Sequence, residues 1–528
     1  MASRRDELNA YTAARKRTVG AFLLPSGGGN DEDAPRPVKA VLPSVVIGVV
    51  IVAGFAMWGV IKPAAPKGWD SGTNIIQGKQ STTRYVVLPG DKGTRVLHQV
   101  LNMSSARLVL PANAKVVIVE DKVLDAYPNH GATIGIPYAP DKLPKSDVAG
   151  QTNKKWSVCN SPGTEEKAPP NQAVFVAADK DATRLADPKL VLGPGESMFV
   201  QAPLDTAGLA GRFMVDRTGT RHLIGSATSS DTANDIIAGS LYGSDAADKP
   251  QRVTEDWLRT LEVGHAIEFQ TPPQFKANQV TQSQLKQLSK AEERRVGRVL
   301  NYDKSFFMVG VDKLYEVSPF QAKLALSNPD LGKTYDGAPA KLYTLSANEY
   351  AALKSVMDEN SMKDPDDLPN ETPTGKAVNH EGRNRLCSTF EGMDGNKIKR
   401  SVWADTEYPT KIDPGAASAR VSPGHGLLFR ALDSNDQGGS GRNFLITETG
   451  LRYLVPANND GGKAGASASA APKDPAQEQQ PGQEQANENQ ARLGFDKVTP
   501  VPVPMLWAKL VPAGPVLSKS DALQPQLA

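Results

Sequence analysis

The chain has 528 residues, with 60 lysine and arginine residues against 58 aspartate and glutamate residues, so its formal net charge is only +2. Once the basic first forty residues are set aside the two signs balance, which excludes a protein drawn to nucleic acid by its charge. The length predicts several domains, and 46 glycine and 40 proline residues with few aromatic residues favour a β-rich α+β fold of short strands and turns.

Residues 1–40 are predicted to form a cytoplasmic segment that begins with a helix over residues 3–24. Ser3 and Asp6 have the spacing of a capping box at its start. Its apolar residues recur broadly on one face, with Arg15 and Arg17 elsewhere, and they are Leu8, Tyr11, Val19 and Phe22. Such a helix lies along the inner leaflet, docks a cytoplasmic partner or is simply solvated, and the sequence leaves these alternatives open.

Residues 41–61, VLPSVVIGVVIVAGFAMWGVI, contain no charged side chain. A helix of this length is roughly 30 Å long, about the thickness of the hydrocarbon core of a bilayer. We therefore predict a single transmembrane helix here. A cleaved signal peptide usually has a shorter apolar core and a small-residue cleavage site, and a buried soluble helix rarely lacks polar residues over such a length.

Basic residues are more frequent before this apolar stretch than after it. Seven lie in residues 1–40, and only Lys62, Lys67 and Lys79 follow closely. The positive-inside rule then places the N-terminus in the cytoplasm. The prediction is a single-pass protein of the plasma membrane, with a short stalk over residues 62–78 and the bulk of the chain extracytoplasmic.

The extracytoplasmic part is written twice, as a first half over residues 79–280 and a second half over residues 301–457. Four motifs recur in the same order, the last of them in a C-terminal segment over residues 491–528. They are SARLVL (105–110) with QAKLAL (321–326), WSVC (156–159) with RLC (385–387), FMVDRTGTRHLI (213–224) with FLITETGLRYLV (444–455), and WLRTLEVG (257–264) with WAKLVPAG (507–514). Such a duplication predicts two halves related by a quasi-two-fold axis.

The third motif predicts a β-hairpin, because alternating apolar residues stand on both sides of a Thr-Gly turn. Gly219 and Gly450 supply the positive φ that such a turn can need, and Arg221 and Arg452 follow them at the same spacing. Tyr85, in the stretch TRYVV (83–87), is interpreted as a further copy of the same strand. We predict about four small repeat modules, two in each half, around a core.

Cys159 and Cys387 are the only cysteines, and they occupy equivalent places in the two halves. An oxidising compartment allows them to pair. Residues equivalent under a quasi-two-fold axis meet only near that axis, so a disulfide between them would join the halves there. Two buried free thiols are the alternative.

Three further segments complete the predicted organisation. Residues 281–300 are predicted as a helical connector, since Leu285, Leu288, Val296 and Val299 are spaced for one face. Ser346 and Glu349 predict a capped helix from Ala347 to about Met357. Residues 458–490 are rich in Gly, Ala, Gln and Glu and are predicted to be a disordered linker, after which residues 491–528 pack back on the core.

No motif predicts a catalytic residue, a cofactor or a metal site. A P-loop is missing, because Gly332-Lys333-Thr334 has no glycine five residues earlier and Gly375-Lys376-Ala377 has no hydroxyl residue. The stretch Gly438–Arg442 fails the pattern of a serine nucleophile elbow. The six histidines have no ligand spacing, and the acidic run from Asp364 to Asp367 is interpreted as a solvated loop rather than a calcium site.

The order of these features resembles the EccB family, the membrane component of actinobacterial type VII (ESX) secretion systems. The matching features are RRD (4–6) and RKR (15–17) before a single anchor, GVIKP (59–63) with Trp69 after it, LN (101–102) with SARL (105–108), the Trp156–Cys159 segment, the Thr-Gly-x-Arg hairpins, and the closing LGF (493–495) to Leu517. The linker at 458–490 is longer than the resemblance leads us to expect.

The resemblance implies a structural scaffold that builds the extracytoplasmic part of an export channel for small helical WXG100-type proteins. The implied partners are an EccC-type motor ATPase, EccD, EccE and further copies of the chain itself. The family is sometimes labelled an ATPase, so a membrane-anchored ATP hydrolase is the alternative function, and a cell-wall-binding module on a stalk is another.

Overall fold

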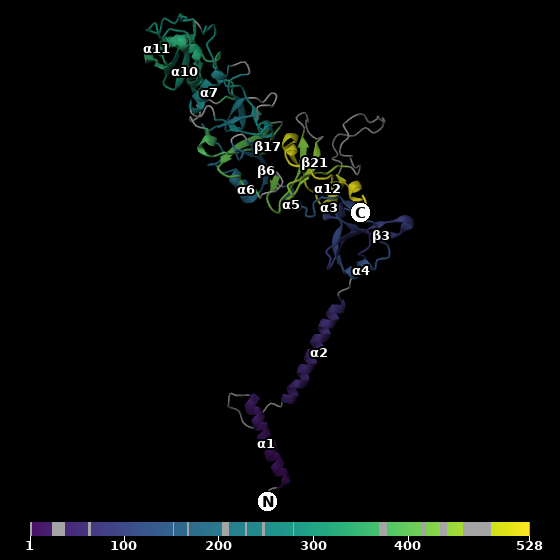
Figure 1. Cartoon of the computed structure of the whole chain (residues 1–528). Coiled ribbons are helices and arrows are strands. Elements are labelled where there is room, and N and C mark those ends of the chain that lie inside the picture. Colours follow the sequence, from purple (N-terminus) through teal and green to yellow (C-terminus); the bar gives the residue numbers. More distant parts are fainter. Residues whose placement is uncertain are drawn as a thin grey trace. The chain divides into compact units, whose positions relative to one another are not determined.

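The computed structural model describes residues 3–23, 37–61, 65–150, 153–165, 168–202, 211–226, 230–244, 249–277, 279–368, 377–395, 397–412, 419–432, 441–457 and 487–526 (Figure 1). Most of the linker predicted at 458–490 lies outside the described residues, as do residues 24–36. The chain divides into two compact units. One consists of residues 1–69, 78–82 and 117–127, and the other of residues 70–77, 83–116 and 128–528.

The first unit begins with two helices, α1 (Arg4–Leu23) and α2 (Pro37–Ile61). The apolar side chains of α1 are exposed, from 43% for Val19 to 89% for Phe22. Arg15 is four residues from both Tyr11 and Val19, so it shares their face rather than lying elsewhere as predicted. Of the helices in the described residues, none combines the length and the apolarity needed to cross a membrane.

The described residues form five β-sheets, whose strands are short, as glycine and proline punctuation predicts. Four of them belong to small modules. Module 1 contains β1 (Asn74–Gly78), β2 (Arg84–Pro89), β3 (Arg95–Val100) and α3 (Met103–Val109), and β4 (Lys115–Val119) and α4 (Asp121–Asp125) follow it. Module 2 contains β7 (Met198–Gln201), β8 (Arg212–Val215), β9 (Thr220–Leu223), α7 (Asp231–Tyr242), β10 (Gln251–Arg252), α9 (Glu255–Arg259) and β11 (Glu262–Val263).

The other two modules follow the same plan. Module 3 contains β12 (Val299–Tyr302), β13 (Ser305–Val309), β14 (Leu314–Val317), α10 (Pro319–Ser327), η2 (Pro329–Tyr335), β15 (Tyr343–Thr344), α11 (Ala347–Leu353), η3 (Lys354–Val356) and β16 (Met357–Asp358). Module 4 contains β20 (Leu427–Leu432), β21 (Arg442–Ile446), β22 (Arg452–Leu454), α12 (Glu488–Arg492), β23 (Val501–Pro504) and α13 (Met505–Lys509), and α14 (Lys519–Ala522) closes the chain.

Each module is built on three consecutive antiparallel strands, and a later segment runs parallel to the third of them. Those parallel partners are His130 and Ile134 beside β3, β11 beside β9, β16 beside β14, and Ala513 beside β22. In modules 2, 3 and 4 the first strand also has a parallel neighbour, namely β10, β15 or β23. In each module the chain therefore forms a helix after the three strands and then returns to add a parallel segment at the edge of the small sheet.

The fifth sheet is the core sheet, with the order β18-β17-β5-β6-β19. Its strands are β5 (Lys155–Ser161), β6 (Asn171–Ala177), β17 (Arg385–Asp394), β18 (Lys397–Asp405) and β19 (Ala419–Val421), with α5 (Ser146–Ala149), α6 (Asp179–Leu185), η1 (Asp91–Gly93) and η4 (Val378–Glu381) elsewhere in the chain. One hairpin comes from each half of the sequence, and the two hairpins pair through β5 and β17. The halves thus share a single sheet.

The C-terminal segment carries several buried residues. Leu493, Phe495 and Leu517 lie in one apolar cluster with Val86 and Val100 of module 1. Helices α12 and α3 lie side by side in this cluster (Figure 1). Arg107 donates to the carbonyl of Leu493, and Arg492 donates to that of Leu110 at 2.6 Å.

Three predicted elements differ from the structure. Residues 282–298 form turns and an isolated bridge instead of a connector helix, because Leu285 and Leu288 pack in one apolar cluster while Val299 packs in another. Tyr85 lies in β2, the middle strand of module 1, whereas Arg221 and Arg452 lie in the third strands of modules 2 and 4, so the stretch around Tyr85 is not a copy of those strands. The third strand of module 1 is β3, which contains His98. The last residues of the predicted linker belong to α12, where Asn489 is fully buried.

The capped helix after Ser346 is confirmed. Ser346 and Glu349 form a reciprocal capping box at the start of α11. The helix ends at Leu353, short of Met357, because Met357 and Asp358 form β16 and pair with β14.

Candidate functional site

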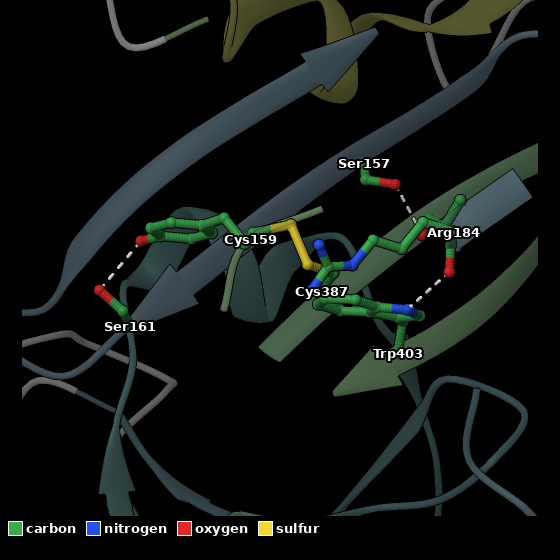
Figure 2. The surroundings of a disulfide bond; sticks show 8 residues. Ser157, Cys159, Ser161, Arg184, Cys387 and Trp403 are labelled. Carbon is green, nitrogen blue, oxygen red and sulfur yellow. Dashed lines mark hydrogen bonds between the residues drawn. A yellow bond between two sulfur atoms is a disulfide. The ribbon is translucent and has the colours of Figure 1, made fainter. Parts of the chain in front are cut away.

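The candidate site is the joint between the halves, where β5 and β17 run antiparallel in the core sheet. Cys159 and Cys387 are direct cross-strand partners, with their Cα atoms 4.0 Å apart, and a disulfide joins them (Figure 2). The two residues are 228 positions apart in the sequence and neither is exposed to solvent. The bond therefore links one half of the chain to the other inside the protein.

Buried polar contacts surround the disulfide. The hydroxyl groups of Ser157 and Thr389 lie 2.7 Å apart across the same strand pair. The indole of Trp403 donates to the carbonyl of Arg184 at 3.1 Å. These groups therefore avoid the cost of being buried without a partner, whereas the Ser388 hydroxyl beside Cys387 has no hydrogen-bond partner among the described residues.

Charged groups fasten the edge of the core sheet beside the joint. The Arg383 guanidinium donates to the carbonyls of Leu190 and Ala404 and to the Glu196 carboxylate, at 2.8 to 3.1 Å. Arg184 pairs with Asp405 at 2.8 Å. Burial raises the pKa of Asp405, but hydrogen bonds from Arg184 and the Thr406 amide outweigh it, so that pKa lies below its usual range.

The opposite face of the core sheet packs on modules 2 and 4. The contact is one large apolar cluster formed by side chains of the core sheet and of both modules. Trp257 of α9 and Trp507 of α13 are fully buried in this cluster, as the shared motif at residues 257–264 and 507–514 suggests. Phe213 and Phe444, from the two matching hairpins, lie in the same cluster. Equivalent residues of modules 2 and 4 therefore pack against the same face of the core sheet.

The predicted turn glycines lie between the second and third strands of modules 2 and 4. Gly219 has φ 80° and Gly450 has φ 75°, conformations that favour glycine. A Cβ atom on Gly219 would also lie 2.8 Å from the Cδ atom of Arg400, which reaches over the turn from β18 to Glu262. Gly219 is therefore needed both for the turn and for the contact with the core sheet.

The predicted arginines at the hairpins stack on aromatic rings. The guanidinium carbon of Arg221 lies 5.5 Å from the ring centre of Phe213, and that of Arg452 lies 5.3 Å from the ring centre of Phe444. The Arg452 Nε atom donates to the Val511 carbonyl at 2.9 Å. Burial lowers the pKa of both guanidinium groups. Both arginines therefore serve packing and hairpin closure.

A contact between an aromatic ring and a glycine recurs in three modules, and sequence reasoning missed it. Gly264 faces the ring of His222, Gly514 faces that of Tyr453, and Gly131 faces that of His98, so that an added Cβ atom would come within 2.2 to 2.5 Å of each ring. Two of the pairs were visible as aligned residues in the third and fourth motifs. Only the structure brings each ring and its glycine together.

Replacing Gly264 or Gly514 by alanine is expected to lower the free energy of unfolding by about 1–3 kcal/mol, because the new methyl group overlaps the neighbouring ring. Gly332→Ala is the matched control, since no atom lies within 4 Å of its added Cβ. Thermal unfolding of the full chain in detergent measures the effect. Equal unfolding temperatures for Gly514→Ala and Gly332→Ala would contradict the packing argument.

The groups considered for chemistry have structural partners. Asp364 accepts hydrogen bonds from Ser318 and Gln270, and Asp367 accepts two from His265. The Thr334 hydroxyl, in the Gly-Lys-Thr stretch, is buried and donates to the Val296 carbonyl. In the part of the chain that the structure describes, no group of three or more His, Cys, Asp or Glu side chains is placed to hold a metal ion.

Lys154, directly before β5, is a buried cation that is 9% exposed, and its ammonium group donates to the Val148 carbonyl. Burial lowers the pKa of Lys154 to about 8 from an ordinary value of 10.5, and the charge of Asp179 offsets this only in part. Between these two pH values the unfolded chain holds a proton that the folded chain has lost. The stability contributed by this group therefore rises as the pH increases from about 8 towards 10.5.

Lys154→Met is accordingly expected to unfold at a higher temperature than the wild type at pH 7, because a charge no longer has to be buried. The difference is expected to shrink as the pH rises from 7 to 10. Lys397→Met, at an exposed position of β18, is the control and is expected to show no pH-dependent difference. A constant difference for Lys154→Met across this range would contradict the assignment.

Known proteins resemble this chain over most of its length. The family model described as "Type VII secretion system ESX-1, transport TM domain B", that of EccB, matches residues 1–526. The ESX-3 secretion system ATPase EccB3 of Mycobacterium tuberculosis is 25% identical over 499 residues, covering 92% of this chain and 82% of the relative. The ESX-1 secretion system ATPase EccB1 of the same species is 25% identical over 435 residues, 79% of each chain.

Two solved structures share the fold. A chain of an intact ESX-5 inner membrane complex matches with a TM-score of 0.58 at 18% identity, covering 100% of this chain and 96% of that one. A chain of the EccB3 dimer from the ESX-3 core complex matches with a TM-score of 0.56 at 22% identity, covering 86% of this chain and 100% of that one.

Proposed function

The chain belongs to the EccB family of type VII (ESX) secretion systems, and from this we propose that it is a structural membrane subunit of such a complex. Its sheet-rich part forms the extracytoplasmic scaffold and supports the export of small helical WXG100-type proteins. The observation that carries the proposal is the joint, where one sheet and one buried disulfide unite both halves of the chain. A frame of this kind suits a part that holds other subunits in place.

In this proposal α2 is the single membrane anchor, with α1 in the cytoplasm and the sheets outside. Supporting this, large apolar side chains in the middle of α2 are exposed, among them Val45, Ile47, Val49, Ile51 and Phe55 at 52–75%. Water would make such exposure costly, whereas lipid would not. The buried disulfide suits an oxidising compartment.

This topology predicts which sites a membrane-impermeant maleimide reaches in intact spheroplasts. Tyr138→Cys, at a side chain 88% exposed in the sheet-rich part, is expected to react at once. Phe22→Cys, 89% exposed on α1, is expected to react only after the membrane is opened. Labelling of Phe22→Cys in sealed spheroplasts would contradict the orientation.

The proposed partners are an EccC-type motor ATPase, EccD, EccE and further copies of this chain. The related structures come from an ESX-5 inner membrane complex and from an EccB3 dimer, which is why assembly and self-association are proposed for this chain. Deleting the gene for this chain in its native host tests the role. The motor-containing particle is expected to shrink on native gels and export to stop, and both should return when the wild-type chain is restored.

An ATP hydrolase is the second candidate, because the names of the relatives include the word ATPase. The sequence lacks a P-loop, and the one Gly-Lys-Thr stretch lies in η2 with its threonine hydroxyl already bonded. ATP turnover by the purified full chain distinguishes the candidates. Turnover that tracks the chain through purification, and normal particle size after deletion, would together favour the enzyme.

A further inference from the structure

Module 4 contains an open pocket of about 690 Å³. It is lined by β20, β21, the end of β22, α12 and residues 496–500. Pockets that hold small molecules usually have volumes of about 300–1,000 Å³, so this one is large enough for a ligand. Neither the joint nor the proposed scaffold role involves it.

The lining of the pocket is positively charged. Arg430, Arg442 and Lys497 line it together with a single acidic residue, Asp496. Counting only described residues, none of the three cations has an ion-pair partner within 4.0 Å, whereas Arg84 and Arg400 each pair with a carboxylate. Three unpaired positive charges around one hollow repel one another, and an anion between them would relieve that repulsion.

A network of amide side chains holds one of these cations in place. Asn443 accepts a hydrogen bond from the Nε atom of Arg430 at 3.2 Å and donates to Gln490 at 3.2 Å. Gln490 is 8% exposed and donates to the carbonyls of Phe495 and Val498 at 2.8 and 2.9 Å. The guanidinium of Arg430 is therefore fixed at its Nε atom by a buried anchor, which lowers the ordering cost of binding a ligand at its outer nitrogens.

The matching place in module 2 lacks this arrangement. Strand register pairs Phe213 with Val200 in module 2 and Phe444 with Phe429 in module 4, so Gln201 stands where module 4 has Arg430. Arg212, at the position of Asn443, forms an ion pair with Asp235 of α7. The shared fold of the modules therefore does not require the charge cluster, which is a property of module 4.

We propose that this pocket binds a small ligand that carries carboxylate or phosphate groups. Guanidinium groups receive both kinds of oxyanion through paired N–H donors, and a lysine adds a mobile point charge. Arg430 supplies the fixed hydrogen-bond donors, and the exposed side chains of Arg442 and Lys497 contact the ligand from the solvent side of the pocket. This inference goes beyond the scaffold role, because it holds whether or not the chain assembles with partners.

Calorimetric titration of the full chain in an uncharged detergent at about 150 mM salt, where long-range attraction is largely screened, tests the proposal. The probes are tripolyphosphate for phosphate groups and citrate for carboxylate groups. We expect saturable binding of at least one probe at one site per chain, and the tighter probe identifies the preferred oxyanion.

Paired variants make the test specific. Arg442→Gln combined with Lys497→Gln is expected to weaken binding about tenfold or more, since two charged contacts are lost. Arg217→Gln, which removes an exposed arginine beside the Gly219 turn of module 2, is the matched control and is expected to bind as the wild type does. The absence of saturable binding for both probes, or an equal loss in the control, would overturn the proposal.

Discussion

Replacing Cys159 and Cys387 together by alanine is expected to lower the free energy of unfolding by about 5 kcal/mol, the largest of the expected effects. The disulfide closes a loop with a sequence separation of 228 residues, so its loss frees a long stretch of the unfolded chain. The folded joint changes little, because the backbone pairing of β5 with β17 remains. Alanine is preferred to serine, which would bury two new hydroxyl groups.

Thermal unfolding of the full chain in detergent measures this loss. The wild type unfolded and refolded in reductant is the control, and it is expected to match the double variant. Reductant added to the folded wild type is expected to act slowly, because both cysteines are fully buried. Equal unfolding temperatures for wild type and double variant would show that the bond contributes nothing to holding the halves together.

Trp507→Ala is expected to cost about 3–5 kcal/mol, the second largest effect, because a fully buried ring is lost from the cluster beneath the core sheet. Phe390 lies against this ring, with the ring centres 5.9 Å apart, and would face the cavity. Trp257→Ala is expected to cost a similar amount, since Trp257 occupies the equivalent place in module 2.

Two further variants separate packing from other causes. Trp507→Phe is expected to cost much less than Trp507→Ala, because the Nε1 atom of Trp507 has no hydrogen-bond partner among the described residues and only ring volume is lost. Tyr138→Ala, at an exposed side chain, is expected to leave the unfolding temperature unchanged. A Trp507→Ala variant as stable as Tyr138→Ala would contradict the role of the shared cluster.

Features fixed by local chemistry were predictable from the sequence. The capping box of Ser346 and Glu349 depends on four consecutive residues, and the structure forms it. The hairpin pattern around the Thr-Gly turns depends on a dozen residues, and β8–β9 and β21–β22 occupy those positions. Short-range rules apply there because the donors, acceptors and backbone angles lie within one or two turns of chain.

Features fixed by distant packing were not predictable. The apolar spacing at 285–299 fits a helix, yet those residues pack in two different clusters, and long-range contacts outweigh the local pattern. The pair Arg84-Tyr85 resembles Arg221-His222 and Arg452-Tyr453 in sequence, yet it lies in a middle strand of its sheet, between β1 and β3. Helix propensity and motif similarity carry no information about which strand pairs with which.

The candidate site was only partly within reach of sequence reasoning. The repeat drew attention to Cys159 and Cys387 and to the hairpins around Gly219 and Gly450, because equivalent positions can be aligned. It did not predict that β5 and β17 would form one continuous sheet, or that Arg400 would cross to Glu262 over the Gly219 turn. The pocket of module 4 was also missed, since its lining comes from several separate segments of chain.

The most direct test of the scaffold role is gentle detergent extraction of the tagged full chain from its native membrane, followed by sizing and mass spectrometry. The scaffold account predicts a particle far larger than the 56.3 kDa chain, containing a motor protein with several ATPase domains and a membrane protein with many spans. The scaffold account would be contradicted if the chain were recovered alone, as a monomer or small oligomer, from an extract in which the motor protein is present and intact.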